Sequence, residues 1–399
     1  MVKFTGDNMK KWTCRAGVIG AAMIVAACGG GTGVSTTTGP GITSLVSFGD
    51  SLSDAGTHAV GTVALLAGGR YTINSGDATN PSKIWLDLIA TQYGLANPCP
   101  ATSGINSRPP FGAPVAVVNN TSCRNYAQGG ARVTELIGPA HTLLPDSAGG
   151  AVGQLDYPVK NQIDNHLAVT GGSFSGKELV TVMAGGNDAF MNGAAVSASV
   201  AGGAAAAGAA TIAGWSAAEI NAVLPGGAAA QQAAATSAVM AMGKAGAELA
   251  GYVKASIVGK GAKYVLVMNL PDLASSIYAL ENPTAAPLMA AMVTAFNGQL
   301  AAGLAGTAGV VVGDAYTTSR DQFANPASYG LSNVTQRACS TDTAKNPLGG
   351  ASLVCNPSNL ITGDVSRYLT ADDIHPTPYG HKLLAQYASK VLASAGWLY

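Results

Sequence analysis

Short apolar runs alternate with helix-like segments along most of the chain, and this alternation is the strongest constraint on its fold. Strand-like runs occupy residues 43–48, 125–127, 179–183, 263–268 and 310–312. Most are apolar at consecutive positions, as expected for strands that are covered on both faces. Strands of this kind that alternate with helices predict an α/β fold with a mainly parallel sheet between helical layers.

Five helices are expected between and after these strands. The segment 81–93 has Asn80 as a candidate cap and Pro81 in its first turn. The other expected helices cover residues 159–169, 228–257, 286–304 and 380–395. The Ala/Gly-rich stretch 193–236 has two interpretations: a helical surface insertion, or a mobile cover over a substrate cleft.

The composition excludes several classes of protein. The chain of 399 residues has 21 basic and 21 acidic side chains, so its charge gives no reason to expect nucleic acid as a partner. Only 11% of residues are charged, against about 25% in typical soluble domains. A hydrophobic fraction of 48% supports a large core, which excludes a disordered or collagen-like chain.

The N-terminal residues have the pattern of an export signal. Lys10, Lys11 and Arg15 precede an uncharged run that ends at Cys28. The sequence before Cys28 resembles a bacterial lipobox, so residues 1–27 are expected to be a signal peptide and Cys28 a lipidation site. Residues 28–42 would then be a flexible tether and 43–399 a single domain. Ordinary cleavage after Ala27 is the alternative.

This export signal predicts that the protein is attached to a membrane. A lipid anchor at Cys28 would place the protein at the outer membrane of a Gram-negative bacterium, and without it the protein would be periplasmic or secreted. Four cysteines remain in the expected mature chain, and three pairings are possible. We favour the two local disulfides, and their spacing does not suggest a metal site. They join Cys99 to Cys123 and Cys339 to Cys355.

A serine follows the first expected strand in the order Gly49, Asp50, Ser51, Leu52. Ligands of open α/β sheets bind beyond the carboxyl ends of the strands, which is where Ser51 is expected. Gly-Asp-Ser by itself is a weak signal, because most such sequences are turns or helix caps.

A candidate general base lies near the other end of the chain. Asp372 precedes His375 by three residues, a spacing at which a tight loop brings the carboxylate to one ring nitrogen and leaves the other for a serine hydroxyl. His58 follows Ser51 but has no carboxylate at an obviously suitable spacing. A metal-binding pair and a surface histidine are the alternative interpretations of the Asp372 and His375 pattern.

Two glycine-containing segments follow strands between Ser51 and His375. Residues 125–131 include Gly129, whose main-chain N–H could face a cleft, and residues 184–188 include Asn187. Donors at such positions would stabilise the negative charge that develops on a carbonyl oxygen during acyl transfer.

With these four blocks in order, the chain resembles the GDSL (SGNH) family of serine esterases and lipases, especially its longer bacterial phospholipase/lecithinase-like branch. The blocks are Gly49-Asp50-Ser51-Leu52, Gly129, Gly185-Gly186-Asn187-Asp188 and Asp372-Asp373-Ile374-His375. The resemblance covers residues 44–395. It implies a flavodoxin-like three-layer α/β/α sandwich with a mainly parallel five-stranded sheet.

The resemblance also implies roles for the matching residues. Ser51 would be the nucleophile, His375 the general base and acid, and Asp372 the carboxylate that orients His375, with Asp373 uninvolved. The oxyanion donors would be Ser51, Gly129 and Asn187, and no cofactor or metal is implied. The expected function is an exported serine hydrolase of lipid-like or short-chain acyl esters. The alternatives are an acyltransferase that passes the acyl group to an alcohol, and a non-catalytic lipoprotein that binds ligands.

Overall fold

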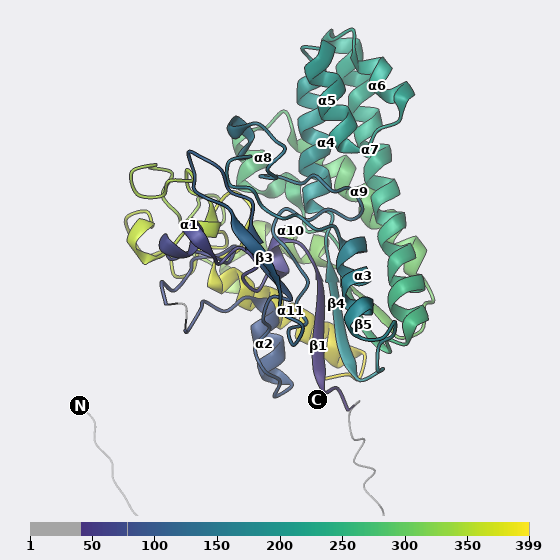
Figure 1. Ribbon diagram of the computed structural model, residues 1–399, viewed down its shortest axis with the longest axis vertical. Coiled ribbons are helices and arrows are strands. Elements are labelled where there is room, and N and C mark those ends of the chain that lie inside the picture. The colour runs from purple at the N-terminus through teal and green to yellow at the C-terminus, as the bar shows by residue number, and fades with distance from the viewer. Residues whose placement is uncertain (1–40, 78, 399) are drawn as a thin grey trace, which may run out of the picture. The chain divides into compact units, whose positions relative to one another are not determined.

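A central sheet of four parallel strands organises the chain (Figure 1). The computed structural model describes residues 41–77 and 79–398, so the expected signal peptide and Cys28 lie outside the described residues. The strands pair in the order β1-β4-β5-β6. They are β1 (Ser44–Gly49), β4 (Glu178–Met183), β5 (Tyr264–Met268) and β6 (Val310–Gly313). The α/β class with a mainly parallel sheet is therefore confirmed.

The fifth expected strand, at residues 125–127, is reduced to a single bridge between Ser47 and Asn125. The N–H of Tyr126 still donates to the carbonyl of Ser47 at 2.8 Å. The side chain of Asn125, however, turns into the loop after β1 and donates to the carbonyl of Ser53 at 2.8 Å. The segment therefore lies along β1 but does not extend the regular ladder, and the sheet has four strands rather than five.

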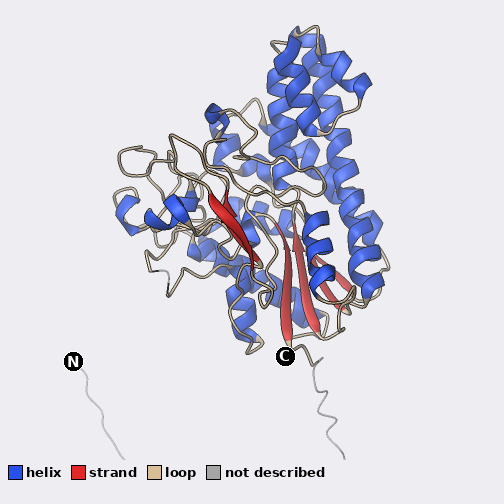
Figure 2. Cartoon of the chain, viewed as in Figure 1, coloured by secondary structure: helices blue, strands red, loops and turns tan. Residues whose placement is uncertain are grey.

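Helices cover both faces of the sheet (Figure 2), and alternate side chains of β4 belong to two different buried clusters. Leu179 and Met183 pack in one buried cluster with α2 (Trp85–Gln92) and α11 (Pro378–Ser394). Val180 and Val182 pack in a second cluster on the opposite face. The helices of that second layer are α3 (Val159–Val169), α7 (Gly227–Tyr252) and α9 (Ala286–Leu304). This alternation is the period-two pattern of a strand between two apolar layers.

Most expected helices form at the expected residues. Helices α3 and α9 have the predicted bounds, and α11 begins two residues earlier than predicted, with Thr377 capping the N–H of Gly380. Helix α2 begins at Trp85 rather than at residue 81. Its start is displaced because Asp87 accepts the N–H of Ile84 at 2.8 Å and pairs with Arg70 at 2.7 Å. A contact that is remote in sequence therefore overrides the local Asn-Pro signal.

The Ala/Gly-rich stretch 193–236 is helical. It spans the end of α4 (Gly186–Ser199), then α5 (Gly203–Ala213) and α6 (Ala217–Val223), and the beginning of α7. Figure 1 shows these helices side by side, beyond the carboxyl ends of the strands. Buried alanines and Trp215 form their contacts, and the Trp215 indole donates to Asn192 Oδ1 at 2.7 Å.

The remaining elements are short. They are the antiparallel pair β2 (Thr102–Ile105) and β3 (Val115–Asn119), together with α1 (Gly61–Leu65), α8 (Ile277–Glu281) and α10 (Ala315–Ala324). Among the described residues, no helix combines the length and apolarity needed to cross a membrane.

Helices α7 and α9 pack closely at glycine, and this contact gives a matched test. A Cβ on Gly246 would lie 2.3 Å from the carbonyl oxygen of Phe296, whereas a Cβ on Gly243 would meet its nearest neighbour at 3.6 Å. Gly243→Ala should raise the free energy of unfolding by up to about 1 kcal/mol, since alanine favours the helix. Gly246→Ala should lower it by roughly 1–3 kcal/mol through overpacking. Urea unfolding of the disulfide-intact variants measures both changes, and changes of the same sign would contradict this account of the interface.

Candidate active site

The turn after β1 presents Ser51 at the carboxyl edge of the sheet. Ser51 opens a short 3-10 turn whose cap is Asp50, and Asp50 Oδ1 accepts the N–H of Leu52 at 3.1 Å. Gly49 has φ +152°, and a Cβ there would lie 2.1 Å from the carbonyl oxygen of Met183. Only glycine therefore allows β1 to approach β4 this closely before the turn.

Gln162 of α3 stabilises the same turn through hydrogen bonds to the backbone of Gly49. Its side chain accepts the N–H of Gly49 at 2.8 Å and donates to the carbonyl of Gly49 at 2.8 Å. The amide also donates to the carbonyl of Tyr157 at 2.7 Å. The sequence analysis missed this residue, because a glutamine inside an amphipathic helix carries no signal of such a role.

The structure brings Ser51, His375 and Asp372 together, although Ser51 lies more than 300 residues from the other two. Ser51 Oγ is 2.8 Å from His375 Nε2. His375 Nδ1 is 2.8 Å from Asp372 Oδ2 and 2.9 Å from Oδ1. An imidazole that donates through Nδ1 has an unprotonated Nε2, which can accept the serine proton.

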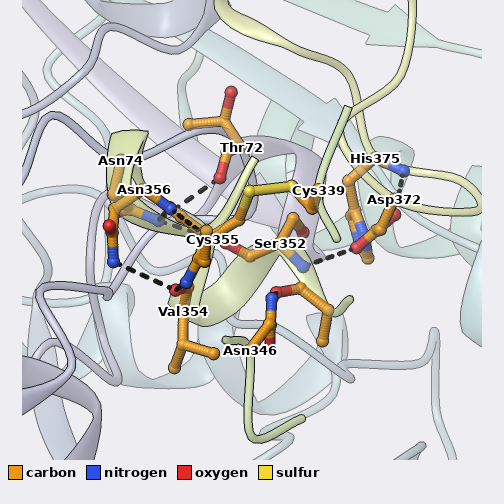
Figure 3. The surroundings of a disulfide bond; sticks show 12 residues. Thr72, Asn74, Cys339, Asn346, Ser352, Val354, Cys355, Asn356, Asp372 and His375 are labelled. Atoms are coloured by element: carbon orange, nitrogen blue, oxygen red, sulfur yellow. Dashed lines mark hydrogen bonds and ion pairs between the residues drawn. A yellow bond between two sulfur atoms is a disulfide. The ribbon is translucent and has the colours of Figure 1, made fainter. Parts of the chain in front are cut away.

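The loop around the Cys339 to Cys355 disulfide supports Asp372 (Figure 3). Asp372 Oδ2 accepts the N–H of Ser352 at 2.9 Å, and the N–H of Cys339 donates to the carbonyl of Ala371 at 2.8 Å. The disulfide therefore joins two segments that both contact the Asp372 loop. Ser352 was not identified from the sequence, since its contribution is a main-chain N–H.

Both favoured disulfide pairings are present in the structure. Cys99 bonds to Cys123 and Cys339 bonds to Cys355. The first closes a loop next to residues 125–128, which run beside β1, and the second lies next to the Asp372 loop.

For both Asp372 and His375, burial shifts the pKa in one direction, and the neighbouring charges and hydrogen bonds shift it in the other. Burial alone would raise the pKa of Asp372, but the His375 charge and the hydrogen bonds to the carboxylate bring this pKa below its usual range. Burial alone would lower the pKa of His375, but the neighbouring Asp372 raises it above the usual histidine value. Burial raises the pKa of Asp50 to about 7.

Asp373 has a different environment from Asp372. Its Oδ1 lies 2.7 Å from Arg337 Nη2, and the same guanidinium contacts Glu281. Asp373 is partly exposed. The two consecutive aspartates are therefore distinguished by their partners, an imidazole for Asp372 and a guanidinium for Asp373.

Of the three expected oxyanion donors, the structure contradicts the one assigned to the N–H of Gly129. The N–H of Gly129 donates to Asp54 Oδ2 at 2.8 Å, so it is already committed. Among the described residues, the N–H groups of Ser51 and Gly130 have no hydrogen-bond partner. The unbonded N–H in this segment is therefore that of Gly130, which the sequence could not distinguish from its neighbour.

The expected donor Asn187 lines the same pocket as Ser51, which is described below. Its Nδ2 donates one hydrogen to the carbonyl of Ala131 at 2.9 Å. This contact fixes the orientation of the amide, and its second hydrogen is available to another acceptor. The same loop that carries Gly130 therefore positions the Asn187 side chain.

A second buried polar network lies behind His375. Leu155 N–H donates to His58 Nε2 at 3.2 Å, and His58 Nδ1 lies 3.2 Å from Tyr71 Oη and 3.7 Å from Asp54 Oδ2. Asp54, four residues before His58, is therefore the nearby carboxylate that the spacing in the sequence did not indicate. The Tyr71 ring also packs against His375 at 5.1 Å between centroids. This network joins the Gly129 segment to the imidazole of His375, while His58 itself stays buried and does not line the pocket.

Ser51, Asn187 and His375 line a pocket of about 370 Å³ at the carboxyl edge of the sheet. Most of the remaining lining is apolar, and it includes Leu52, Met183, Phe190, Leu270, Leu273 and Phe323. None of the lining residues belongs to 193–236. The helical insertion therefore contributes no wall to this pocket in the structure.

The described residues contain no cluster of three His, Cys, Asp or Glu side chains arranged to hold a metal ion. The chemistry available at this pocket is that of a serine hydroxyl, an imidazole, a carboxylate and amide donors. Together these groups match the requirements of nucleophilic acyl chemistry.

Comparisons with known proteins agree with this geometry. A family model described as GDSL-like Lipase/Acylhydrolase matches residues 45–388. Esterase EstA of Pseudomonas aeruginosa is 31% identical over 140 residues, which are 34% of this chain and 20% of that esterase. Esterase EstA of Pseudomonas putida matches with the same identity and coverage, so the similar region spans about a fifth of each relative. Because the family model covers most of the chain, the protein belongs to the GDSL-like lipase/acylhydrolase family.

Proposed function

We propose that the protein hydrolyses carboxylic esters through an acyl-enzyme formed on Ser51. The observation that carries this proposal is the hydrogen-bonded series from Ser51 Oγ through His375 to Asp372, with contacts of 2.8 Å at each step. Its position in an apolar pocket supports a substrate with an acyl chain. The two relatives named as esterases support the same reaction class.

In the first half of the reaction, Ser51 Oγ attacks the ester carbonyl carbon while His375 Nε2 takes the hydroxyl proton. The negative charge moves to the carbonyl oxygen, where the N–H groups of Ser51 and Gly130 and the Asn187 amide would donate to it. Each such donor typically lowers the barrier by about 2.7–4 kcal/mol. Asp372 stabilises the imidazolium that forms.

In the second half, His375 returns its proton to the leaving alcohol oxygen as the carbon–oxygen bond breaks. The acyl group then remains on Ser51 as an ester. Water attacks this ester while His375 accepts one of its protons, and the carboxylic acid leaves as Ser51 regains its hydrogen. The substrates proposed are lipid-like or short-chain acyl esters.

Ser51→Ala should reduce kcat by at least about four orders of magnitude, because the nucleophile is lost. The melting temperature should change little, since within residues 41–77 and 79–398 the Ser51 side chain bonds only to His375. Hydrolysis of p-nitrophenyl esters and labelling by a fluorophosphonate measure the effect. Retention of turnover or of labelling at position 51 would contradict the proposed nucleophile.

The activity should rise with pH through an apparent pKa above that of an ordinary histidine, because His375 must be neutral to accept the serine proton and Asp372 raises its pKa. Asp50, with a pKa raised to about 7, titrates in the same window. The profile of kcat/KM against pH therefore reports the coupled groups rather than His375 alone. A decrease in kcat/KM over this window would contradict the role of His375 as a base.

The adjacent aspartates form a matched pair of variants. Asp372→Asn should lower kcat by about 10⁴-fold, as expected when the orienting carboxylate is lost, and should shift the pH profile to lower pH. Asp373→Asn should change kcat by less than about tenfold, because its partner is Arg337. Equal losses would contradict the assignment of Asp372 as the orienting carboxylate.

Export is part of this proposal, with Cys28 as the lipid-modified residue. The two disulfides support passage through an oxidising compartment. In a Gram-negative host, the wild type should incorporate labelled palmitate and fractionate with membranes. Cys28→Ala should do neither. A wild-type protein that stays unlabelled and soluble would contradict the anchor and favour ordinary cleavage after Ala27.

A further inference from the structure

Most polar side chains in the wall of the pocket around Ser51 are already bonded within the protein. Thr318 Oγ1 donates to the carbonyl of Asp314 at 2.9 Å, and Ser276 Oγ donates to the carbonyl of Leu273 at 2.6 Å. Ser319 Oγ donates to the carbonyl of Tyr316 and accepts the N–H of Asp272. These groups are satisfied without a ligand.

Gln322 differs from these residues. It lies on α10, on the same face as Ala315, Thr318 and Ser319, and all four line the pocket. Gln322 is only 7% exposed, and among the described residues its side-chain amide has no hydrogen-bond partner, although its polar atoms are not fully enclosed. Asp272, at the same wall, is instead bonded to Ser275 at 2.7 Å.

An amide at a pocket wall that has no partner within the protein can bond to water, and a ligand that displaces this water must replace its hydrogen bonds or binding is weakened. The amide of Gln322 offers both donors and an acceptor. A hydroxyl group matches it well, since one oxygen can donate to Oε1 or accept from Nε2. Apolar lining residues such as Phe323 would contact the apolar part of the same substrate.

We propose that Gln322 is a specificity residue that recognises a hydroxyl group on the part of the ester substrate held in the apolar pocket. This inference rests on the proposed ester hydrolysis at Ser51. The hydroxyl belongs either to a hydroxylated acyl chain or to a polyol in the alcohol part, and both sources present the same group to the amide. Gln322 takes no part in proton transfer, which remains with His375.

The test compares esters that differ by one hydroxyl group in two series. The first series pairs p-nitrophenyl decanoate with p-nitrophenyl esters of hydroxydecanoic acids. The second pairs methyl decanoate with glyceryl monodecanoate. The wild type should favour the hydroxylated member of one series in kcat/KM, and the series that shows the preference identifies the source of the hydroxyl group.

Gln322→Met keeps the size of the side chain and removes its polar atoms. It should lower kcat/KM for the preferred hydroxylated ester by about 5- to 100-fold and change the unsubstituted ester by less than about threefold. Gln232→Met, an exposed position on α7, is the matched control and should change neither. Gln322→Asn, which shortens the side chain but keeps the amide, is a second variant for use if the Met variant fails to fold cooperatively.

Equal turnover of the two members of each series by the wild type would overturn the role of Gln322 while leaving the proposed ester hydrolysis intact. Equal losses on both members in Gln322→Met would do the same. A wild type that hydrolyses none of the four kinds of ester would overturn the proposed function itself, and the role of Gln322 with it.

Discussion

The parallel pairing of β1 with β4 determines where the candidate active site can form. Its register places Gly49 opposite Met183, and the N–H of Asp50 continues the pairing by donating to the Met183 carbonyl. Ser51 and Asn187 therefore emerge a few residues beyond the ends of adjacent strands. A side chain at position 49 would separate these strand ends, because its Cβ would meet the Met183 carbonyl oxygen.

The loop that carries Asp372 and His375 has no regular secondary structure, and polar contacts hold it in place. Asp372 accepts three main-chain N–H groups besides the imidazole of His375. One of these donors, Ser352, lies three residues before Cys355 and therefore depends on the Cys339 to Cys355 crosslink. A buried carboxylate with this many donors remains ionised, and it can hold the histidine in one orientation.

The small residues of the helical layers serve a packing role that is separate from the chemistry. Gly246 and Gly303 let α7 and α9 approach closely, because a Cβ on either would overlap the facing helix. The Ala-rich helices α5 and α6 extend this packing away from the pocket. The chain can therefore be rich in alanine and glycine and still surround a rigid site.

The secondary structure elements and the local chemistry could be predicted from the order of the residues. Apolar runs located β1, β4, β5 and β6 because strands covered on both faces need them, and the spacing of Asp372 and His375 indicated that one loop could bring them together. Tertiary structure decided what depends on remote contacts. Asp54 accepts the N–H of Gly129, so that of Gly130 stays unbonded within the described part of the chain. Arg70 pairs with Asp87 and so displaces the start of α2. Gln162 accepts the N–H of Gly49. These partners lie between about fifteen and more than a hundred residues apart, and only the packed fold brings their atoms within hydrogen-bond distance.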